Sequence, residues 1–114
     1  MSQKTQSRWK KMRTDETRQI EDVLGKAFQK ADAYRYNSAS IRVRVIDQRF
    51  EGKTDEERDA IVEPLLKTLP EATQADIMIL LTLSQNEMAA APTMELHPRR
   101  LLNLEFEDPT PSKL

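Results

Sequence analysis

The residues able to carry chemistry are few in this chain. Its 114 residues include no cysteine and a single histidine, His97, so thiolate metal sites are excluded and nucleophile–base pairs are nearly so. The run "GKT" at residues 52–54 ends like a phosphate-binding loop, but Asp47 stands where such a loop requires its first glycine. The acidic residues within 55–59 are typical of a helix start with a solvated face. The sequence therefore predicts no enzyme, no metal site and no cofactor.

Basic residues are the remaining candidates for a binding function. The opening stretch "MSQKTQSRWKKMR" has no acidic residue and carries these cations: Lys4, Arg8, Lys10, Lys11 and Arg13. It predicts a flexible basic arm over residues 1–14, which is either a solvated tail or a contact for phosphate groups. The net charge of −1 and the pI near 5.9 argue against a whole surface built for nucleic acid or anionic membrane. Any phosphate contact must therefore be local.

The elements that position these residues begin with a helix and a hairpin. Apolar residues at three- and four-residue spacing predict a helix over 15–31, capped by Thr14 or Asp15. Alternating residues at 34–36 and 41–45 then predict two short strands joined by a turn at "NSAS". If the apolar residues of the second strand face the helices, Arg42 and Arg44 form a basic row on the opposite face. That row is either solvated or a binding surface.

The segment "RFEGKT" predicts a structural joint between the second strand and a second helix. Gly52 permits a sharp turn, Phe50 fills the seam between sheet and helix, and Thr54 with Glu57 forms a capping box. Pro64 predicts a kink or a division of that helix. The apolar run "DIMILLTL" predicts a third strand. The expected fold is α+β, with two layers in the order α-β-β-α-α-β and helices on one face of a three-stranded mixed sheet.

The C-terminal segment follows the expected domain, which covers residues 15–88. Within the extension at 89–114, apolar residues alternate with polar ones near Phe106 and predict an added strand at 101–106. The alternatives are a peptide that docks on a partner's sheet and an apolar tail that lies across its own domain. The end, "DPTPSKL", is predicted to be disordered.

The second predicted strand is followed by a Phe-x-Gly motif, a helix with an arginine, a stripe of valine and leucine, and a last strand. The residues of this pattern are Phe50, Gly52, Arg58, Val62 and Leu66. With this pattern, residues 17 to 87 resemble the BolA-like family. The resemblance implies a fold similar to a type II KH domain. It also implies partnership with a monothiol glutaredoxin, a shared 2Fe-2S cluster and, in some members, DNA binding.

The chain departs from the family at the positions that ligate the cluster. The resemblance places Asp76 where the family has a histidine, and it places the second ligand position in "YNSAS", which has neither histidine nor cysteine. Because iron–sulfur clusters favour thiolate and imidazole ligands, cluster sharing is not expected.

The expected function is therefore that of a non-enzymatic, BolA-like accessory or regulatory binding protein, a possible partner of a monothiol glutaredoxin in iron–sulfur, redox or stress regulation. The alternative is a small nucleic-acid-binding regulator that uses the basic arm and a KH-like sheet. The candidate partner or nucleic-acid surface consists of Lys10, Lys11, Arg13, Arg42, Arg44, Arg49, Lys53 and Arg58. The short apolar runs predict no membrane segment, and we expect a cytoplasmic monomer or weak dimer.

Overall fold

The centre of the molecule is a three-stranded sheet with the order β1-β2-β3. The computed structural model describes residues 9–90 and Phe106. Strand β1 spans Lys30–Asn37, β2 spans Ser40–Ile46 and β3 spans Ile77–Leu83. Because β1 and β2 run antiparallel and β2 and β3 run parallel, the sheet is mixed. Strand β2 is central, and β1 and β3 are the two edge strands.

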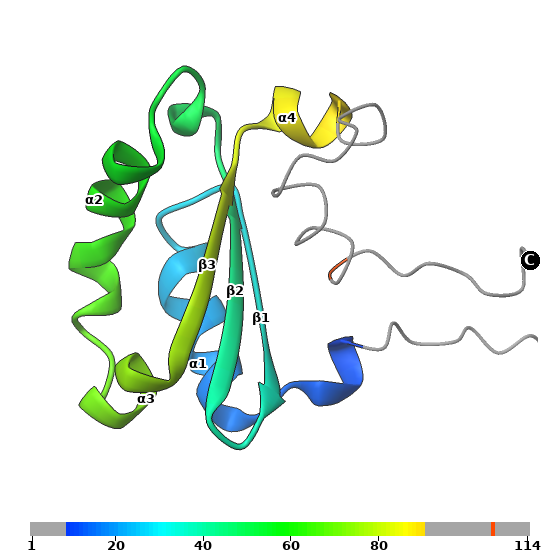
Figure 1. Cartoon of the computed structure of the whole chain (residues 1–114), viewed down its shortest axis with the longest axis vertical. Helices are drawn as coiled ribbons and strands as arrows, with labels where there is room; N and C mark the ends of the chain where they lie inside the picture. The colour runs from blue at the N-terminus through cyan, green and yellow to red at the C-terminus, as the bar shows by residue number, and fades with distance from the viewer. Residues whose placement is uncertain (1–8, 91–105, 107–114) are drawn as a thin grey trace, which may run out of the picture.

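Two helices cover one face of this sheet. Helices α1 (Asp15–Gly25) and α2 (Asp55–Leu66) lie on the same side of the strands, and α3 (Glu71–Asp76) leads directly into β3 (Figure 1). The short helices η1 (Trp9–Met12) and α4 (Gln85–Ala90) lie on the other side (Figure 1). The predicted α+β class, with helices packed on a three-stranded mixed sheet, is confirmed. No helix within residues 9–90 has the length and apolar character required to cross a membrane.

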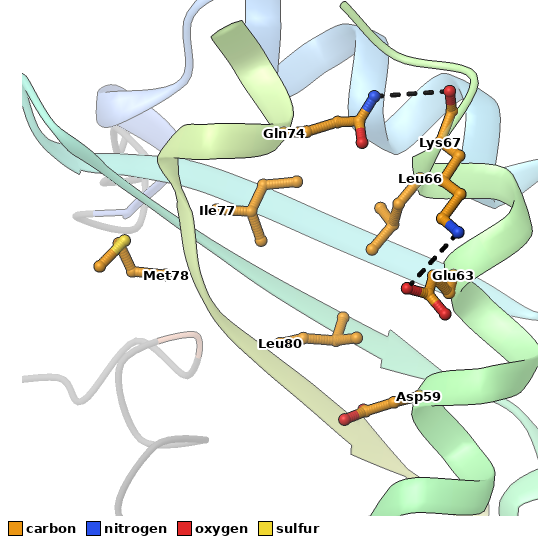
Figure 2. A pocket seen from close by; sticks show the side chains of 8 residues that line it. All are labelled: Asp59, Glu63, Leu66, Lys67, Gln74, Ile77, Met78 and Leu80. Atoms are coloured by element: carbon orange, nitrogen blue, oxygen red, sulfur yellow. Dashed lines mark hydrogen bonds and ion pairs between the residues drawn. The ribbon is translucent and has the colours of Figure 1, made fainter. Parts of the chain in front are cut away.

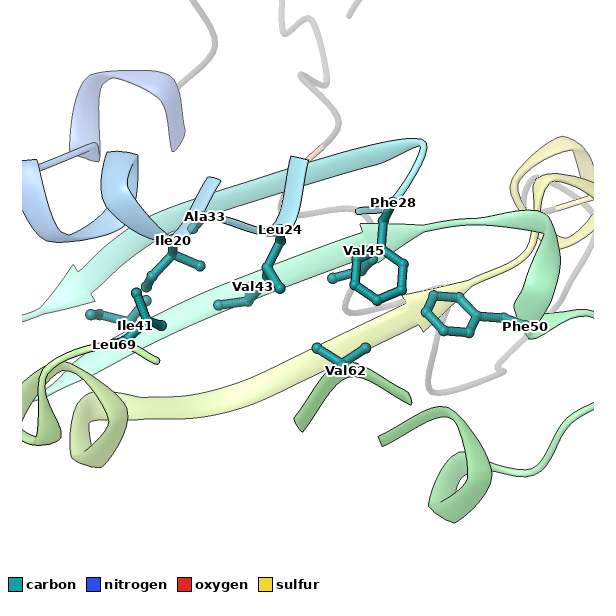
Figure 3. Close-up of a cluster of buried hydrophobic side chains, with 10 residues drawn as sticks. All are labelled: Ile20, Leu24, Phe28, Ala33, Ile41, Val43, Val45, Phe50, Val62 and Leu69. Atoms are coloured by element: carbon teal, nitrogen blue, oxygen red, sulfur yellow. The ribbon is translucent and has the colours of Figure 1, made fainter. Parts of the chain in front are cut away.

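The main core fills the space between the two helices and the sheet (Figure 3). Ile20 and Leu24 point from α1 toward Val43 and Val45 of β2, while Val62 closes the core from α2 (Figure 3). All five side chains are fully buried. Removal of this apolar surface from water is the main favourable term in folding, and it explains why Gly25 is tolerated at the end of α1.

The first helix is shorter than predicted, and the first strand is longer. The predicted helix over 15–31 ends at Gly25, and β1 already begins at Lys30. Phe28 still reaches the core, where its ring stacks on Phe50 at a centroid distance of 5.8 Å, but it does so from a loop. The helical spacing of Phe28 and Ala31 is therefore coincidental, because Phe28 packs into the core from a loop and Ala31 belongs to β1. Thr14 is the N-cap, as predicted.

The joint at residues 50–53 is a type II turn. Glu51 has φ −60° and ψ 128°, Gly52 has φ +76°, and the Lys53 N–H donates to the Phe50 carbonyl at 3.1 Å. A positive φ at the third position of this turn favours glycine. Phe50 is fully buried beneath the turn, so the predicted structural roles of Phe50 and Gly52 are confirmed.

The capping box at the start of α2 is also confirmed. The Glu57 N–H donates to the Thr54 hydroxyl at 3.1 Å, and the Thr54 N–H donates to the Glu57 carboxylate at 2.9 Å. Pro64 lies inside the last turn of α2 and does not divide it. The break falls instead after Leu66, before Pro70 caps α3.

A smaller cluster covers the face of the sheet opposite to α1 and α2. The Phe106 ring meets the Tyr34 ring edge-on at 5.2 Å, and Met12 packs beside them. Phe106 lies in a turn and is 5% exposed. The rest of the predicted strand at 101–106 lies outside the described residues. At Phe106 itself, the chain packs on its own domain.

The two glycines provide a matched test of the turn. A Cβ atom added at Gly25 or at Gly52 would have no packing neighbour within 4 Å, so only backbone conformation distinguishes the two positions. Gly52→Ala forces alanine to a positive φ and should lower the free energy of unfolding by about 1 kcal/mol. Gly25→Ala should leave it unchanged or raise it by up to about 1 kcal/mol, since alanine favours helix. Urea unfolding midpoints that shift equally for both variants would contradict this role of Gly52.

Candidate functional site

The predicted basic row on the sheet is wrong at Arg44. Arg44 is 2% exposed, and its guanidinium donates to the Asp32 carboxylate on β1 at 2.6 and 3.1 Å. Asp32 and Arg44 face each other directly in the β1–β2 register. The guanidinium also lies 4.8 Å from the centre of the Phe106 ring. Arg44 is therefore a buried structural residue, because an arginine on this covered face requires a carboxylate partner.

Arg58 is likewise buried, against the expectation that it lies on a partner surface. It is 2% exposed and donates to the Glu87 carboxylate at 2.7 and 3.0 Å. It also donates to the backbone carbonyls of Lys53 at 2.9 Å and Thr82 at 3.0 Å. One side chain thus ties α2, the preceding loop, β3 and α4 together.

Arg42 and Arg49 are held by aromatic rings. The Arg42 guanidinium lies 3.8 Å from the centre of the Tyr36 ring, and the Arg49 guanidinium lies 4.6 Å from that of Phe28. Arg49 also pairs with Asp47 at 2.9 Å. Such stacking positions a guanidinium and partly removes it from solvent.

The lysines and Arg13 differ in their exposure. Lys11 and Lys53 are exposed, whereas Arg13 is half-buried and pairs with Glu21 at 2.9 Å. Lys10 lies in η1. Because Arg44 and Arg58 are buried, the eight predicted residues are not one exposed basic surface. Nucleic-acid binding through the basic arm stays a prediction, since residues 1–8 lie outside the described part.

The positions that the resemblance assigns to cluster ligands have structural roles. Asp76 ends α3 and pairs with Arg35 at 3.1 Å, and Arg35 also pairs with Glu16 at 3.0 Å. In the hairpin turn, the Asn37 side chain accepts from the Ala39 N–H at 2.8 Å. Within the described residues, no three side chains of His, Cys, Asp or Glu come together to hold a metal ion. His97 lies outside that part.

A groove of about 440 Å³ lies between α2, α3 and the outer edge of β3 (Figure 2). Leu66, Ile77 and Leu80 form its apolar floor, whereas Met78 leaves β3 on the opposite side and is 64% exposed (Figure 2). Its lining consists of Asp59, Glu63, Leu66, Lys67, Gln74, Ile77, Met78 and Leu80. Among the predicted surface residues, Arg58 is the direct neighbour in sequence of a residue that lines this groove, Asp59.

The backbone of β3 turns unpaired groups toward the groove. The Leu83 carbonyl accepts from the Asp47 N–H on the β2 side. Because peptide groups alternate in direction along a strand, the N–H and C=O of Leu80 and Thr82 point away from β2. Arg58 covers the Thr82 carbonyl, but no described residue bonds to the outward groups of Leu80. The edge is therefore open beside the apolar floor.

The charge of the groove is concentrated at Asp59. Lys67 lies 3.9 Å from Glu63 and offsets part of its charge. Asp59 lies beside Leu80, at the end of the groove away from Gln74 (Figure 2). Partial burial raises the pKa of the Asp59 carboxyl, and the negative charges of Glu63 and Glu56 raise it further. A cation placed there would relieve this repulsion.

Sequence reasoning missed several of these residues. The signal for Glu87 is "SQNE", since Ser84 and Glu87 form a capping box with bonds of 2.9 and 3.1 Å. The signal for Asp32 is its position in the predicted hairpin, where an acidic residue opposite Arg44 indicates a cross-strand ion pair. The groove had no local signal, because its walls are far apart in the sequence.

Comparison with protein-family models, curated proteins and solved structures finds no match to this chain. The BolA-like resemblance therefore stays a prediction.

The Asp32–Arg44 pair can be tested by a double-mutant cycle. Asp32→Leu alone removes the carboxylate that the buried Arg44 guanidinium contacts at 2.6 Å, and it should lower the free energy of unfolding by about 3 kcal/mol or more. Adding Arg44→Met should restore most of that loss, since both charges are then removed. The exposed pair of Asp22 and Lys26 is the control, and the same changes there should each cost less than about 0.5 kcal/mol. Additive losses at Asp32 and Arg44 in urea unfolding would contradict their coupling.

Asp47 should make stability depend on pH. Burial raises the pKa of its carboxyl, but hydrogen bonds from the Arg49 side chain and from the N–H groups of Arg49 and Gln29 outweigh this and lower it. A lowered pKa in the folded state contributes stability above the unfolded-state pKa, near about 3.9, which is lost as pH falls through the folded value. The stability difference between wild type and Asp47→Asn should therefore be larger at about pH 6 than at about pH 3. A constant difference in urea midpoints would contradict this account.

Proposed function

We propose that this protein is a non-enzymatic accessory protein that binds an extended segment of a partner protein along the outer edge of β3. The observation that carries the proposal is the outward backbone of Leu80 beside the groove. Main-chain hydrogen bonds at a sheet edge supply affinity in this mode of recognition, and side-chain pockets supply specificity. The open edge at Leu80 offers the main-chain hydrogen bonds, and the groove beside it offers a pocket for side chains.

The contrast between the two edges of the sheet supports this choice. On the β1 edge, the Ala33 N–H donates to the Glu21 carboxylate of α1 at 3.0 Å, and Arg13 holds that carboxylate. This edge strand therefore has a carboxylate bonded to its backbone, which is unfavourable for pairing with another strand. On the β3 edge, the comparable protection by Arg58 ends at Thr82.

The resemblance to BolA-like proteins supports one class of partner, a monothiol glutaredoxin. Contact with such a partner requires no cluster ligand from this chain. The ion pair of Asp76 with Arg35 at 3.1 Å favours contact without a shared cluster, because the carboxylate already has a cationic partner. The proposal therefore assigns binding to the backbone edge.

Two substitutions at Leu80 test the edge directly. Linear peptides selected on the wild-type protein from a random library are measured against Leu80→Ala and Leu80→Pro. Both variants lose the leucine side chain, but only proline removes the outward N–H, and that N–H has no partner in β2. Because Leu80→Ala retains the backbone edge, it should still bind these peptides, and Leu80→Pro should bind them about tenfold more weakly than Leu80→Ala.

The outcome depends on the two variants being folded, which circular dichroism and urea unfolding check. Equal affinities of the two folded variants would show that the Leu80 N–H takes no part. Failure to select any peptide that binds β3 would equally contradict the proposed function.

A further inference from the structure

The groove beside β3 differs from a plain apolar groove in its charge. Its floor is Leu66, Ile77 and Leu80, and its charged rim is Asp59, Glu63 and Lys67. Since Lys67 stands next to Glu63, the uncompensated charge lies at the Asp59 end. Apolar and negative parts are thus arranged one after the other along the strand.

An added strand would present its side chains to this groove in a fixed order. Side chains of an extended chain alternate between faces, so residues i and i+2 point to the same side about 7 Å apart. A residue placed over the floor between Leu66 and Ile77 is thus followed, two positions along, by one near Asp59. The intervening residue points to the side of Met78.

We propose that the occupant of the groove is an extended segment of a partner protein with an apolar side chain and, two residues away on the same face, a lysine or arginine. This inference rests on the proposed function and specifies its ligand. The apolar side chain fills the floor and the cation pairs with Asp59. Charge complementarity selects this segment over neutral or acidic ones.

The same charge argues against a second copy of this chain. A β3 edge paired with the β3 edge of another copy would bring two Asp59-bearing rims toward one seam, and like charges repel. The described end of the basic arm, from Trp9 onward, does not compete either, since η1 packs beside β1 at the opposite edge of the sheet (Figure 1). A cationic segment of another protein is the occupant that fits.

Raised proton affinity at Asp59 is consistent with this assignment. Partial burial, Glu63 and Glu56 all raise the pKa of its carboxyl. A bound cation would act in the opposite direction and favour the ionised form.

Capped octapeptides of alternating threonine and valine provide the probe. One carries a leucine followed two positions later by lysine, a second has these two in reverse order, and two more have glutamate in place of lysine. Titration of each peptide, followed by the NMR chemical shifts of the backbone amides, gives both its affinity and the location of its binding site. At least one lysine peptide should shift the amides of β3 and bind about three- to tenfold more tightly than its glutamate counterpart.

Two isosteric variants with the same change of charge locate the effect. Asp59→Asn should remove most of the preference for lysine, whereas Asp22→Asn should retain it, since Asp22 lies exposed on α1. Higher salt should reduce the preference in wild type. A preference that is absent, or that Asp59→Asn leaves unchanged, would overturn the assigned ligand.

The failures of the two proposals are distinguishable. Shifts at β3 with equal affinity for lysine and glutamate peptides would retain strand addition and reject the cationic ligand. No shift at β3 with any peptide would reject both. Light scattering could instead detect a dimer whose β3 amide shifts change on dilution. That result would show that a second copy of this chain occupies the β3 edge, and it would overturn the inference.

Discussion

A three-stranded sheet has two edge strands, and the outward peptide groups of each must meet water, a side chain or another strand. In this protein that constraint is met differently at the two edges. Glu21 of α1 accepts from the Ala33 N–H and covers the middle of the β1 edge. Arg58 of α2 donates to the Thr82 carbonyl and closes one end of the β3 edge. Leu80, whose outward groups have no bonding partner among the described residues, lies beside the groove.

Three arginines connect the elements around these edges. Arg44, Arg58 and Arg13 each hold a carboxylate from a different element, so that pairs of elements are fixed by directed, charge-assisted hydrogen bonds. Arginines that look like a basic surface in the sequence are thus part of the framework. The charge that remains available to a ligand at the groove is the negative charge on α2, at Asp59.

The sequence was sufficient for the fold class and for local features. Capping at Thr14 and Thr54, the turn at Gly52 and the alternation of β2 are set by neighbouring residues, and all of them were predictable. The end of α1 at Gly25 was not, because Phe28 and Ala31 continue the helical spacing of apolar residues, although Phe28 lies in a loop and Ala31 belongs to β1. Local sequence patterns predicted where this helix starts, whereas tertiary packing, which they do not encode, determines where it ends.

The site was the least predictable part, for a physical reason. The groove brings Asp59 of α2 next to Leu80 of β3, and the burial of Arg44 depends on Asp32, one strand away, and on Phe106 near the C-terminal end. Exposure of a charged residue is a property of the whole fold, whereas residue type is local. The predicted partner or nucleic-acid surface therefore rested on cations whose partners could not be seen in the sequence.

The open edge at Leu80 is the central claim, and native-state amide hydrogen exchange tests it most directly. In the free protein, the Leu80 amide should exchange many times faster than its neighbours Ile79 and Leu81, whose peptide groups point to β2. Strong protection of Leu80, equal to that of Leu81, would show that its outward N–H already has a partner and would contradict the account.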